Sequence, residues 1–309
     1  MNNNTLKQGI LITFSAYLLW GVLPIYWKLL DHLPASEVLA HRIIWSFVFT
    51  VFLVLITGHW RDLLQTLHTL QKDRKKTVAV ITASVVISIN WFLFIFSVQH
   101  GHVLQASLGY YINPLFSILL AVFVLKEKTT KGQVLSFILA GIGVVYLTLS
   151  YGVFPWISLL LAASFALYGL IKKTIDLNAM YGLTIETLVV TPFALLFLIL
   201  ASSKGSVSFS SFLSMDSLLL IGGGVATAIP LLLFASGAKR IPLAMVGFLQ
   251  YVSPTIMFFL GVFLYNEPFT IHHMITFSFI WIALMIYMAS IYWKKPQIKN
   301  QKAISENNQ

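Results

Sequence analysis

The chain contains LGYYINPLFSILLAVFVLKEKTT at residues 108–130 and FLQYVSPTIMFFLGVFLYNEPFT at residues 248–270. At an offset of 140, seven positions of the first stretch recur in the second, and the spacing from the proline to the following glutamate is the same in both. The recurring residues are Tyr111, Pro114, Leu120, Val122, Phe123, Glu127 and Thr130, which correspond to Tyr251, Pro254, Leu260, Val262, Phe263, Glu267 and Thr270. This pattern indicates an internal repeat.

A weaker match extends the repeat towards the N-terminus. Residues 19–21 (LWG) resemble residues 167–169 (LYG) at an offset of 148. We therefore expect a first repeat over residues 1–150, a second over residues 151–293 and a polar cytoplasmic tail over residues 294–309.

The composition is that of a membrane protein, with 58% hydrophobic and 10% charged residues and a mean hydropathy of +0.85. A helix of about 20 apolar residues spans a bilayer. The sequence has ten such runs, at residues 8–29, 36–57, 77–98, 103–125, 132–150, 153–171, 179–201, 214–236, 241–264 and 271–292. The first run lacks a small-residue cleavage site, so we interpret it as a span and not as a signal peptide.

The basic residues test this arrangement independently, because Lys and Arg collect in cytoplasmic loops. Of the 20 basic residues, 17 fall in the two termini and the alternate loops on one side, two (Lys28 and Lys204) fall on the other side, and Arg42 lies inside a span. We therefore expect both termini in the cytoplasm. The net charge of +10 belongs to loops beside membrane lipids, and no nucleic-acid partner is expected.

Each repeat holds five of the predicted spans. Because five is odd, the second repeat must enter the membrane from the opposite face. The predicted fold is therefore an all-α membrane protein with ten transmembrane helices in two inverted five-helix repeats. Inverted repeats are typical of alternating-access transporters.

Several segments resemble one family, the RarD-type permeases of the EamA branch of the drug/metabolite transporter superfamily. The segments are AYLLWGVLPIYWK (16–28), EVLAHRIIWS (37–46), NWFLFI (90–95), QASLGYYINP (105–114), SFALYGLIKK (164–173), IET (185–187), GFLQYVSPTIMFF (247–259) and FSFIWIAL (277–284). The resemblance implies ten helices, the inner membrane of a bacterium and a central cavity between the repeats. It supplies no substrate, although the RarD name is tied to chloramphenicol sensitivity. Gln105 departs from the family, in which an acidic residue is expected.

The two prolines of the repeat mark the predicted binding region. A proline inside a helix leaves a carbonyl oxygen four residues earlier without its donor, and such a group at bilayer depth needs a partner. Interrupted helices at matching positions of both halves indicate a substrate site, although a packing kink remains the alternative. The expected substrate-binding residues around Pro114 and Pro254 are Tyr110, Tyr111, Asn113, Gln250, Tyr251 and Ser253, which suit neutral or zwitterionic solutes with aromatic or amide parts.

Two charged residues lie within the spans, where burial is costly and usually functional. Arg42 lies six residues from the outer end of its span, and Glu186 lies seven residues from the inner end of another. At 1.5 Å per residue each is roughly 10 Å deep, so no direct salt bridge between them is expected. Arg42 is expected in the outer vestibule, unless it snorkels to the interface. Glu186 is expected to face the inner vestibule, where burial favours the protonated carboxyl and could let it carry a coupling proton.

Other polar residues of the spans are weaker candidates. His41 is a possible vestibule residue and Asn90 a possible substrate ligand, but both could simply bond a neighbouring helix. Glu127 and Glu267 end their spans beside loops and are expected to pair with Lys or backbone groups. Three adjacent glycines at 222–224 have no following lysine, which favours close helix packing over phosphate binding.

Three classes of function remain open. A transporter of small organic molecules such as metabolites, amino acids or drugs is favoured; the alternative is a membrane-embedded enzyme or a receptor for a lipid-soluble ligand. An enzyme would need a cluster of acid, base or nucleophile, and the ten acidic residues do not cluster. The expectation is therefore no catalytic residue, no metal and no cofactor, with a small-molecule substrate and membrane lipids as partners. The oligomeric state is left open.

Overall fold

The computed structural model describes residues 3–125, 130–151, 154–175, 177–203, 214–238, 240–241 and 249–306, and over these residues it contains helices and no strand. The elements are α1 (Asn3–Lys28), α2 (Ala35–Ile56), α3 (Trp60–Lys72), α4 (Arg74–Gln99), α5 (Val103–Leu125), α6 (Lys131–Tyr151), α7 (Trp156–Thr174), α8 (Ala179–Ser203), α9 (Met215–Ala238), α11 (Val252–Phe259), the π-helical η1 (Leu260–Leu264) and α12 (Ile271–Glu306). The predicted all-α fold is confirmed.

Within the described residues, seven helices are long and apolar enough to cross a membrane, and two shorter apolar helices accompany them, at Trp156–Lys172 and Val252–Leu264. Many large apolar side chains point outward; for example, Phe193 is 71% exposed and Phe263 is 72% exposed. Lipid chains would cover such surfaces, whereas water would not solvate them. The chain is therefore an integral membrane protein.

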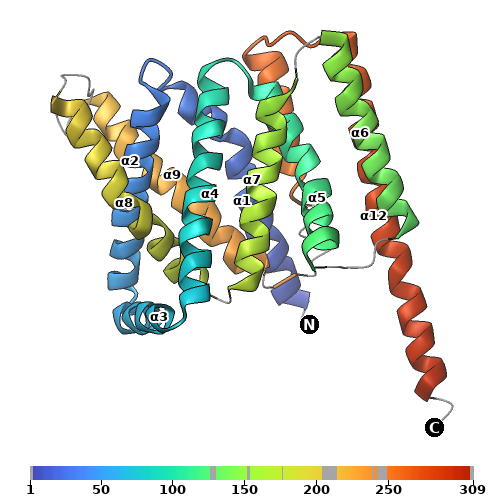
Figure 1. Cartoon of the computed structure of the whole chain (residues 1–309), viewed down its shortest axis with the longest axis horizontal. Coiled ribbons are helices and arrows are strands. Elements are labelled where there is room, and N and C mark those ends of the chain that lie inside the picture. Colours follow the sequence, from blue (N-terminus) through green and yellow to red (C-terminus); the bar gives the residue numbers. More distant parts are fainter. Residues whose placement is uncertain are drawn as a thin grey trace.

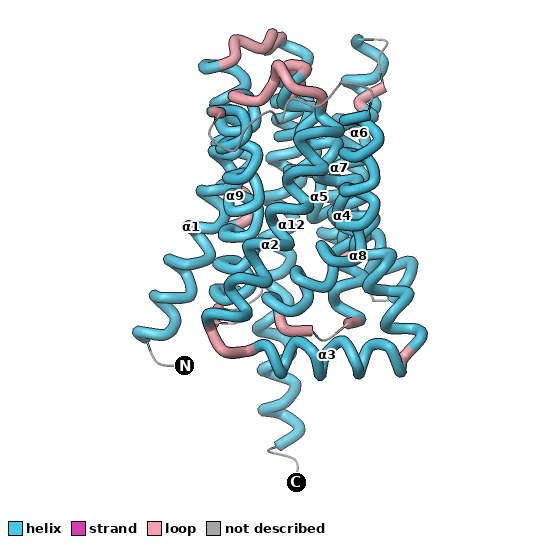
Figure 2. Tube along the Cα trace, turned by 90° about the vertical axis from the view of Figure 1, so that its left-hand side faces the viewer, coloured by secondary structure: helices cyan, strands magenta, loops and turns pink. Residues whose placement is uncertain are grey.

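The long helices run side by side, and α6 packs along α12 at one edge of the bundle (Figures 1 and 2). Within the rest of the bundle, α1 packs against α9 and α11, while α7 packs against α4 and α5. The helix α2 packs against both α8 and α9. Both views show the two chain ends at the end of the bundle where α3 lies.

The helix α3 occupies a segment that we expected to be a loop. Leu63 and Leu70 are buried two turns apart, and most other positions are polar and exposed, although the apolar Trp60 and Leu64 are exposed as well. These two leucines pack with Val54 and Val80 under the ends of α2 and α4. The side chain of Asp73 then accepts hydrogen bonds from two backbone N–H groups at the start of α4. The polar residues of the helix, among them Arg61, Asp62 and Lys72, obscured this amphipathic spacing in the sequence.

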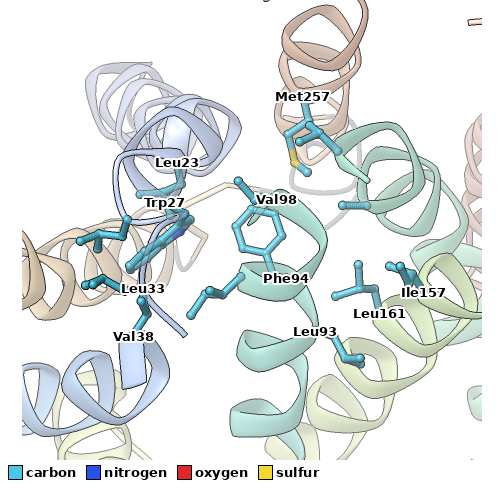
Figure 3. Close-up of a cluster of buried hydrophobic side chains, with 14 of the residues drawn as sticks. Leu23, Trp27, Leu33, Val38, Leu93, Phe94, Val98, Ile157, Leu161 and Met257 are labelled. Carbon is cyan, nitrogen blue, oxygen red and sulfur yellow. The ribbon is translucent and has the colours of Figure 1, made fainter. Parts of the chain in front are cut away.

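The largest cluster of buried apolar side chains joins both halves of the chain (Figure 3). Trp27 of α1 lies beside Leu33 and Val38, and Phe94 of α4 faces the same cluster, to which Met257 of α11 also contributes. Inside a membrane, close van der Waals packing and not water exclusion holds such helices together.

Close packing explains the adjacent glycines of α9. A Cβ atom on Gly224 would collide with the backbone of Trp45 and Ser46 in α2. The carbonyl oxygen of Gly224 accepts a hydrogen bond from Ser46 Oγ at 3.2 Å. The prediction that these glycines serve helix packing is confirmed at this position.

The two repeat prolines occupy different positions in their helices. The helix α5 runs from Val103 to Leu125 without interruption, so the expected break at Pro114 does not occur. A single lost hydrogen bond can be tolerated in a helix that neighbouring helices support. The helix α11 begins at Val252, which makes Pro254 its third residue, and the turn at Gln250 and Tyr251 precedes it. Proline fits there because the first N–H groups of a helix have no intrahelical acceptor.

Candidate functional site

A cavity lies at the centre of the bundle, between helices from both halves of the chain. The space left for the centres of water-sized molecules is about 80 Å³, roughly enough for a few waters. A larger solute therefore requires the surrounding helices to separate. The lining residues are Tyr17, Trp20 and Leu23 of α1, Arg42 of α2, Ile87, Asn90, Trp91 and Phe94 of α4, Tyr110 and Asn113 of α5, Phe165 of α7, Leu231 of α9, and Gln250, Ser253 and Pro254 at the start of α11.

Helical spacing explains which side chains reach this cavity. The residues Ile87, Asn90, Trp91 and Phe94 occupy positions i, i+3, i+4 and i+7 of α4, which lie on one face of a helix. This cavity face consists mostly of rings and apolar groups, with Asn90 as its one polar member. The cavity thus combines a largely aromatic wall with a few polar groups, as solute-binding sites generally do.

Among the described lining residues Arg42 is the charged one, and its guanidinium carbon lies over two indole rings. Its Cζ atom is 4.8 Å from the ring centroid of Trp27 and 4.6 Å from that of Trp91. The residue is only 4% exposed, and its Nε and Nη1 atoms have no hydrogen-bond partner among the described residues. The two ring faces stabilise the cation by about 0.5–2 kcal/mol each, but they do not satisfy these N–H groups. The structure places Arg42 in the wall of the central cavity, and its place in an outer vestibule stays a prediction.

Five of the seven predicted substrate-binding residues lie together in this lining. The five are Asn90, Tyr110, Asn113, Gln250 and Ser253. Pro254 and Arg42 line the same cavity. Residues from the first and second halves of the sequence therefore meet at one cavity.

Tyr111 and Tyr251 require a correction, because they do not line the central cavity. They stack on each other with ring centroids 6.2 Å apart and line a separate groove beside Trp281 of α12. The hydroxyl of Tyr111 lies 2.7 Å from Thr255 Oγ1. Consecutive residues of a helix point about 100° apart, so Tyr110 faces the cavity while Tyr111 faces α12.

The side-chain amides of Asn90 and Asn113 differ in their hydrogen bonds. The side-chain nitrogen of Asn90 donates to Leu161 O at 3.1 Å and to Ser164 Oγ at 2.9 Å, so it links α4 to α7. The bond to a neighbouring helix that we considered for Asn90 is thus present. The Oδ1 atom of Asn113 is buried and has no hydrogen-bond partner among the described residues, which leaves an acceptor at the cavity.

Glu186 lies outside the cavity lining, in a polar cluster between α7 and α8. It is 2% exposed, and its Oε1 atom lies 2.6 Å from Lys172 Nζ. Its Oε2 atom accepts a hydrogen bond from Tyr168 at 2.9 Å. Glu186 is paired with Lys172 and not with Arg42, in agreement with the expectation that Arg42 and Glu186 form no salt bridge.

Lys172 was missed as a partner of Glu186 because the sequence assigned it to a cytoplasmic loop. The two residues lie on different helices, so their spacing along the chain carries no local signal. His41 was considered for a vestibule, but it is buried on α2 and is absent from the cavity lining.

Glu267 has the structural role that its position predicted. Its two carboxylate oxygens accept the backbone N–H groups of Val103 at 2.6 Å and Leu104 at 2.8 Å, at the start of α5. Burial raises the pKa of this carboxyl, while the two N–H donors act in the opposite direction. Its repeat counterpart Glu127 lies outside the described residues.

We expect Glu267→Ala to lower the stability of the purified protein by about 1–2 kcal/mol, because two N–H groups at the start of α5 lose their acceptor. Glu267→Gln retains one acceptor oxygen and should lose less. The measurement is the thermal unfolding midpoint in detergent. Equal midpoints for wild type and the Ala variant would show that this cap contributes nothing.

Metal binding finds no support in the described part of the chain, where no three His, Cys, Asp or Glu side chains lie close enough to hold an ion. Apart from Tyr110, the aromatic residues of the cavity were not predicted from the sequence. Trp91 and Phe94 share a helix face with Asn90, and that spacing could have identified them.

The chain is similar in sequence to known transporters and similar in fold to a solved structure. The model of the EamA-like transporter family matches residues 7–149. The uncharacterized transporter YojE of Bacillus subtilis (strain 168) is 45% identical over 96% of this chain and 98% of its own length. Protein RarD of Escherichia coli (strain K12) is 42% identical over 96% of this chain and 99% of its own length. A solved crystal structure of another protein, 18% identical, has a similar fold with a TM-score of 0.59 over 91% of this chain and 96% of that one.

Proposed function

Because the chain belongs to the EamA-like transporter family and is homologous to the RarD proteins, we propose that it is a multi-pass permease or exporter that moves small organic molecules by alternating access. The observation that carries this proposal is the central cavity, whose lining combines residues of both halves of the chain. A solute bound there would contact helices that can separate on either side of the membrane. Its proposed location is the bacterial inner membrane.

The pairing of helices supports the inverted repeat. If α1, α2, α4, α5 and α6 correspond in order to α7, α8, α9, α11 and α12, the packing of α4 on α7 corresponds to that of α9 on α1. In the same way, α5 on α7 corresponds to α11 on α1. The pairs α2 with α8 and α6 with α12 each correspond to themselves. A two-fold relation between five-helix halves would produce this arrangement.

The ten-span topology makes a direct prediction for reporter fusions. Both chain ends lie at the α3 end of the bundle (Figures 1 and 2), and the alternation of basic residues assigns that end to the cytoplasm. We expect cytoplasmic signals after Lys76, Lys131, Lys173 and Arg240, and external signals near Gly101, Gly152 and Lys204. An external signal at Lys173 would contradict the inverted arrangement.

Glu186 is the proposed site of proton coupling. Protonation would remove the charge that holds Lys172 at 2.6 Å and would loosen the tie between α7 and α8. Release of the proton would restore the pair. This exchange would link the charge state of one carboxyl to the packing of two helices that belong to the same repeat.

The experiment that tests the function is a growth screen. A deletion strain and a strain that overexpresses the protein are compared against a panel of antibiotics and amino acids. Sensitivity that rises with expression indicates uptake, and resistance that rises with expression indicates export. If no compound separates the strains, and radiolabelled members of the panel cross the membranes of both at equal rates, the transport proposal is contradicted.

A further inference from the structure

Arg42 is a buried cation whose hydrogen-bonding capacity is only partly used. A charged side chain at this depth of a membrane protein is costly and requires compensation. The Cζ atom of its guanidinium group lies over the rings of Trp27 and Trp91, 4.8 and 4.6 Å from their centroids. The Nε and Nη1 atoms of the same group have no hydrogen-bond partner among the described residues. Part of the N–H edge of the guanidinium group is therefore unused.

The protein offers no carboxylate to this edge within the described cavity wall, since none of the lining residues is acidic. Glu186, the deep carboxylate of α8, is engaged by Lys172 and Tyr168. Glu37 lies on α2, five residues before Arg42, and is therefore rotated by about 140° around the helix. The positive charge of the cavity is thus not balanced by an acidic side chain of the cavity wall.

We propose that Arg42 binds the carboxylate of the transported solute, and that the substrates are organic monocarboxylates with an aromatic or flat apolar body. A planar guanidinium with free N–H groups matches a carboxylate better than any neutral group. The inference rests on the proposed function, because it takes the central cavity to be the solute site.

The rest of the lining fits this class of solute. Aromatic rings surround the space beside Arg42 and offer surfaces for a flat apolar body; they belong to Tyr17, Trp20, Trp91, Phe94, Tyr110 and Phe165. None of the described lining residues is acidic, which disfavours solutes that also carry an ammonium group. The proposed solutes are therefore net anions, in place of the neutral or zwitterionic class expected from the sequence.

Three compounds with one skeleton separate these possibilities. They are 3-phenylpropanoate, its neutral amide 3-phenylpropanamide, and phenylalanine, which adds an ammonium group to the carboxylate. Binding to the purified protein in detergent is measured by calorimetry and by the shift of the thermal midpoint. A hydrogen bond to a charged group contributes about 1.5–3 kcal/mol, so 3-phenylpropanoate should bind roughly ten- to a hundredfold more tightly than the amide. Phenylalanine should bind more weakly than 3-phenylpropanoate.

Variants of Arg42 test whether this residue causes the preference for the carboxylate over the amide. Arg42→Gln should abolish the preference for the carboxylate over the amide, and Arg42→Lys should retain part of it because the charge remains without the planar fork. Arg61→Gln is the matched control, since Arg61 is an exposed residue of α3. This control should bind all three compounds as wild type does. Should Arg42→Gln fail to fold, the comparison of the three compounds on wild type still tests the proposal.

Four results would overturn the proposal: no binding of 3-phenylpropanoate to wild type, equal binding of carboxylate and amide, a preference that persists in Arg42→Gln, or tighter binding of phenylalanine. None of them bears on whether the protein transports solutes. The growth screen tests transport without regard to the charge of the solute, so the two failures can be distinguished.

Discussion

Replacing Ser253 by Trp should abolish transport and the growth phenotype that accompanies it. Ser253 lies at the start of α11, is buried and lines the central cavity. The cavity leaves about 80 Å³ for the centres of water-sized molecules, so an indole group would fill it. We expect a loss of at least about tenfold in the rate of solute movement, because the site would be occupied and not merely weakened. The measurement is expression-dependent uptake or export in cells.

Thr82→Trp provides the matched control, because Thr82 lies on an exposed position of α4. The same indole group placed there should leave transport close to that of wild type. If Ser253→Trp does not reach the membrane, Ser253→Cys can be modified after folding with a bulky thiol reagent, since the natural chain has no cysteine. Undiminished transport by a protein with a filled cavity would show that the solute takes another route.

Neutralising Glu186 should separate two activities of the transporter. Glu186→Gln mimics the protonated carboxyl, so accumulation or extrusion driven by a pH gradient should vanish while exchange down the solute's own gradient persists. Glu186→Asp should retain partial coupling. The measurement is solute uptake into vesicles that contain the purified variants, with and without an imposed pH gradient. A Gln variant that responds to the gradient as wild type does would make Glu186 a structural residue.

The ion pair between Glu186 and Lys172 can be tested separately, through its effect on the stability of the protein. Removing one partner of a buried pair leaves the other charge uncompensated, at a cost on the order of 3–5 kcal/mol for full burial. The Lys172 side chain is 27% exposed, so Lys172→Met should cost less, about 1–3 kcal/mol. The double variant Lys172→Met/Glu186→Gln should recover much of this stability. Additive losses in the double variant would mean that the two residues do not interact.

Much of this fold could be predicted from the sequence because membrane helices are recognisable by length and composition. The start and end of α2 and α4 agree with the predicted runs within a few residues. The segment of α3 was misread, because its charged residues resemble a loop until their spacing is considered. Pro114 was expected to interrupt a helix that continues through it. Whether a proline ends a helix depends on neighbouring helices, which a single sequence does not specify.

The candidate site was predictable in its location and less so in its details. The repeated sequence pattern pointed to Tyr110, Asn113, Gln250 and Ser253, and these four residues line the same cavity. The sequence did not show that the side chains of the adjacent residues Tyr110 and Tyr111 point in different directions. The pairing of Glu186 with Lys172 joins two helices whose relative depth the sequence could not provide. Tertiary contacts of this kind depend on rotation and vertical shift of helices, which hydropathy does not encode.

The central claim is that the cavity opens to each side of the membrane in turn. A single cysteine in place of Asn113, which lines the cavity from α5, allows this to be measured with a membrane-impermeant thiol reagent in vesicles of both orientations. The account predicts that the reagent reacts from either side and that a saturating solute slows both reactions. A cysteine that reacts from one side only, in every condition and with transport intact, would contradict alternating access through this cavity.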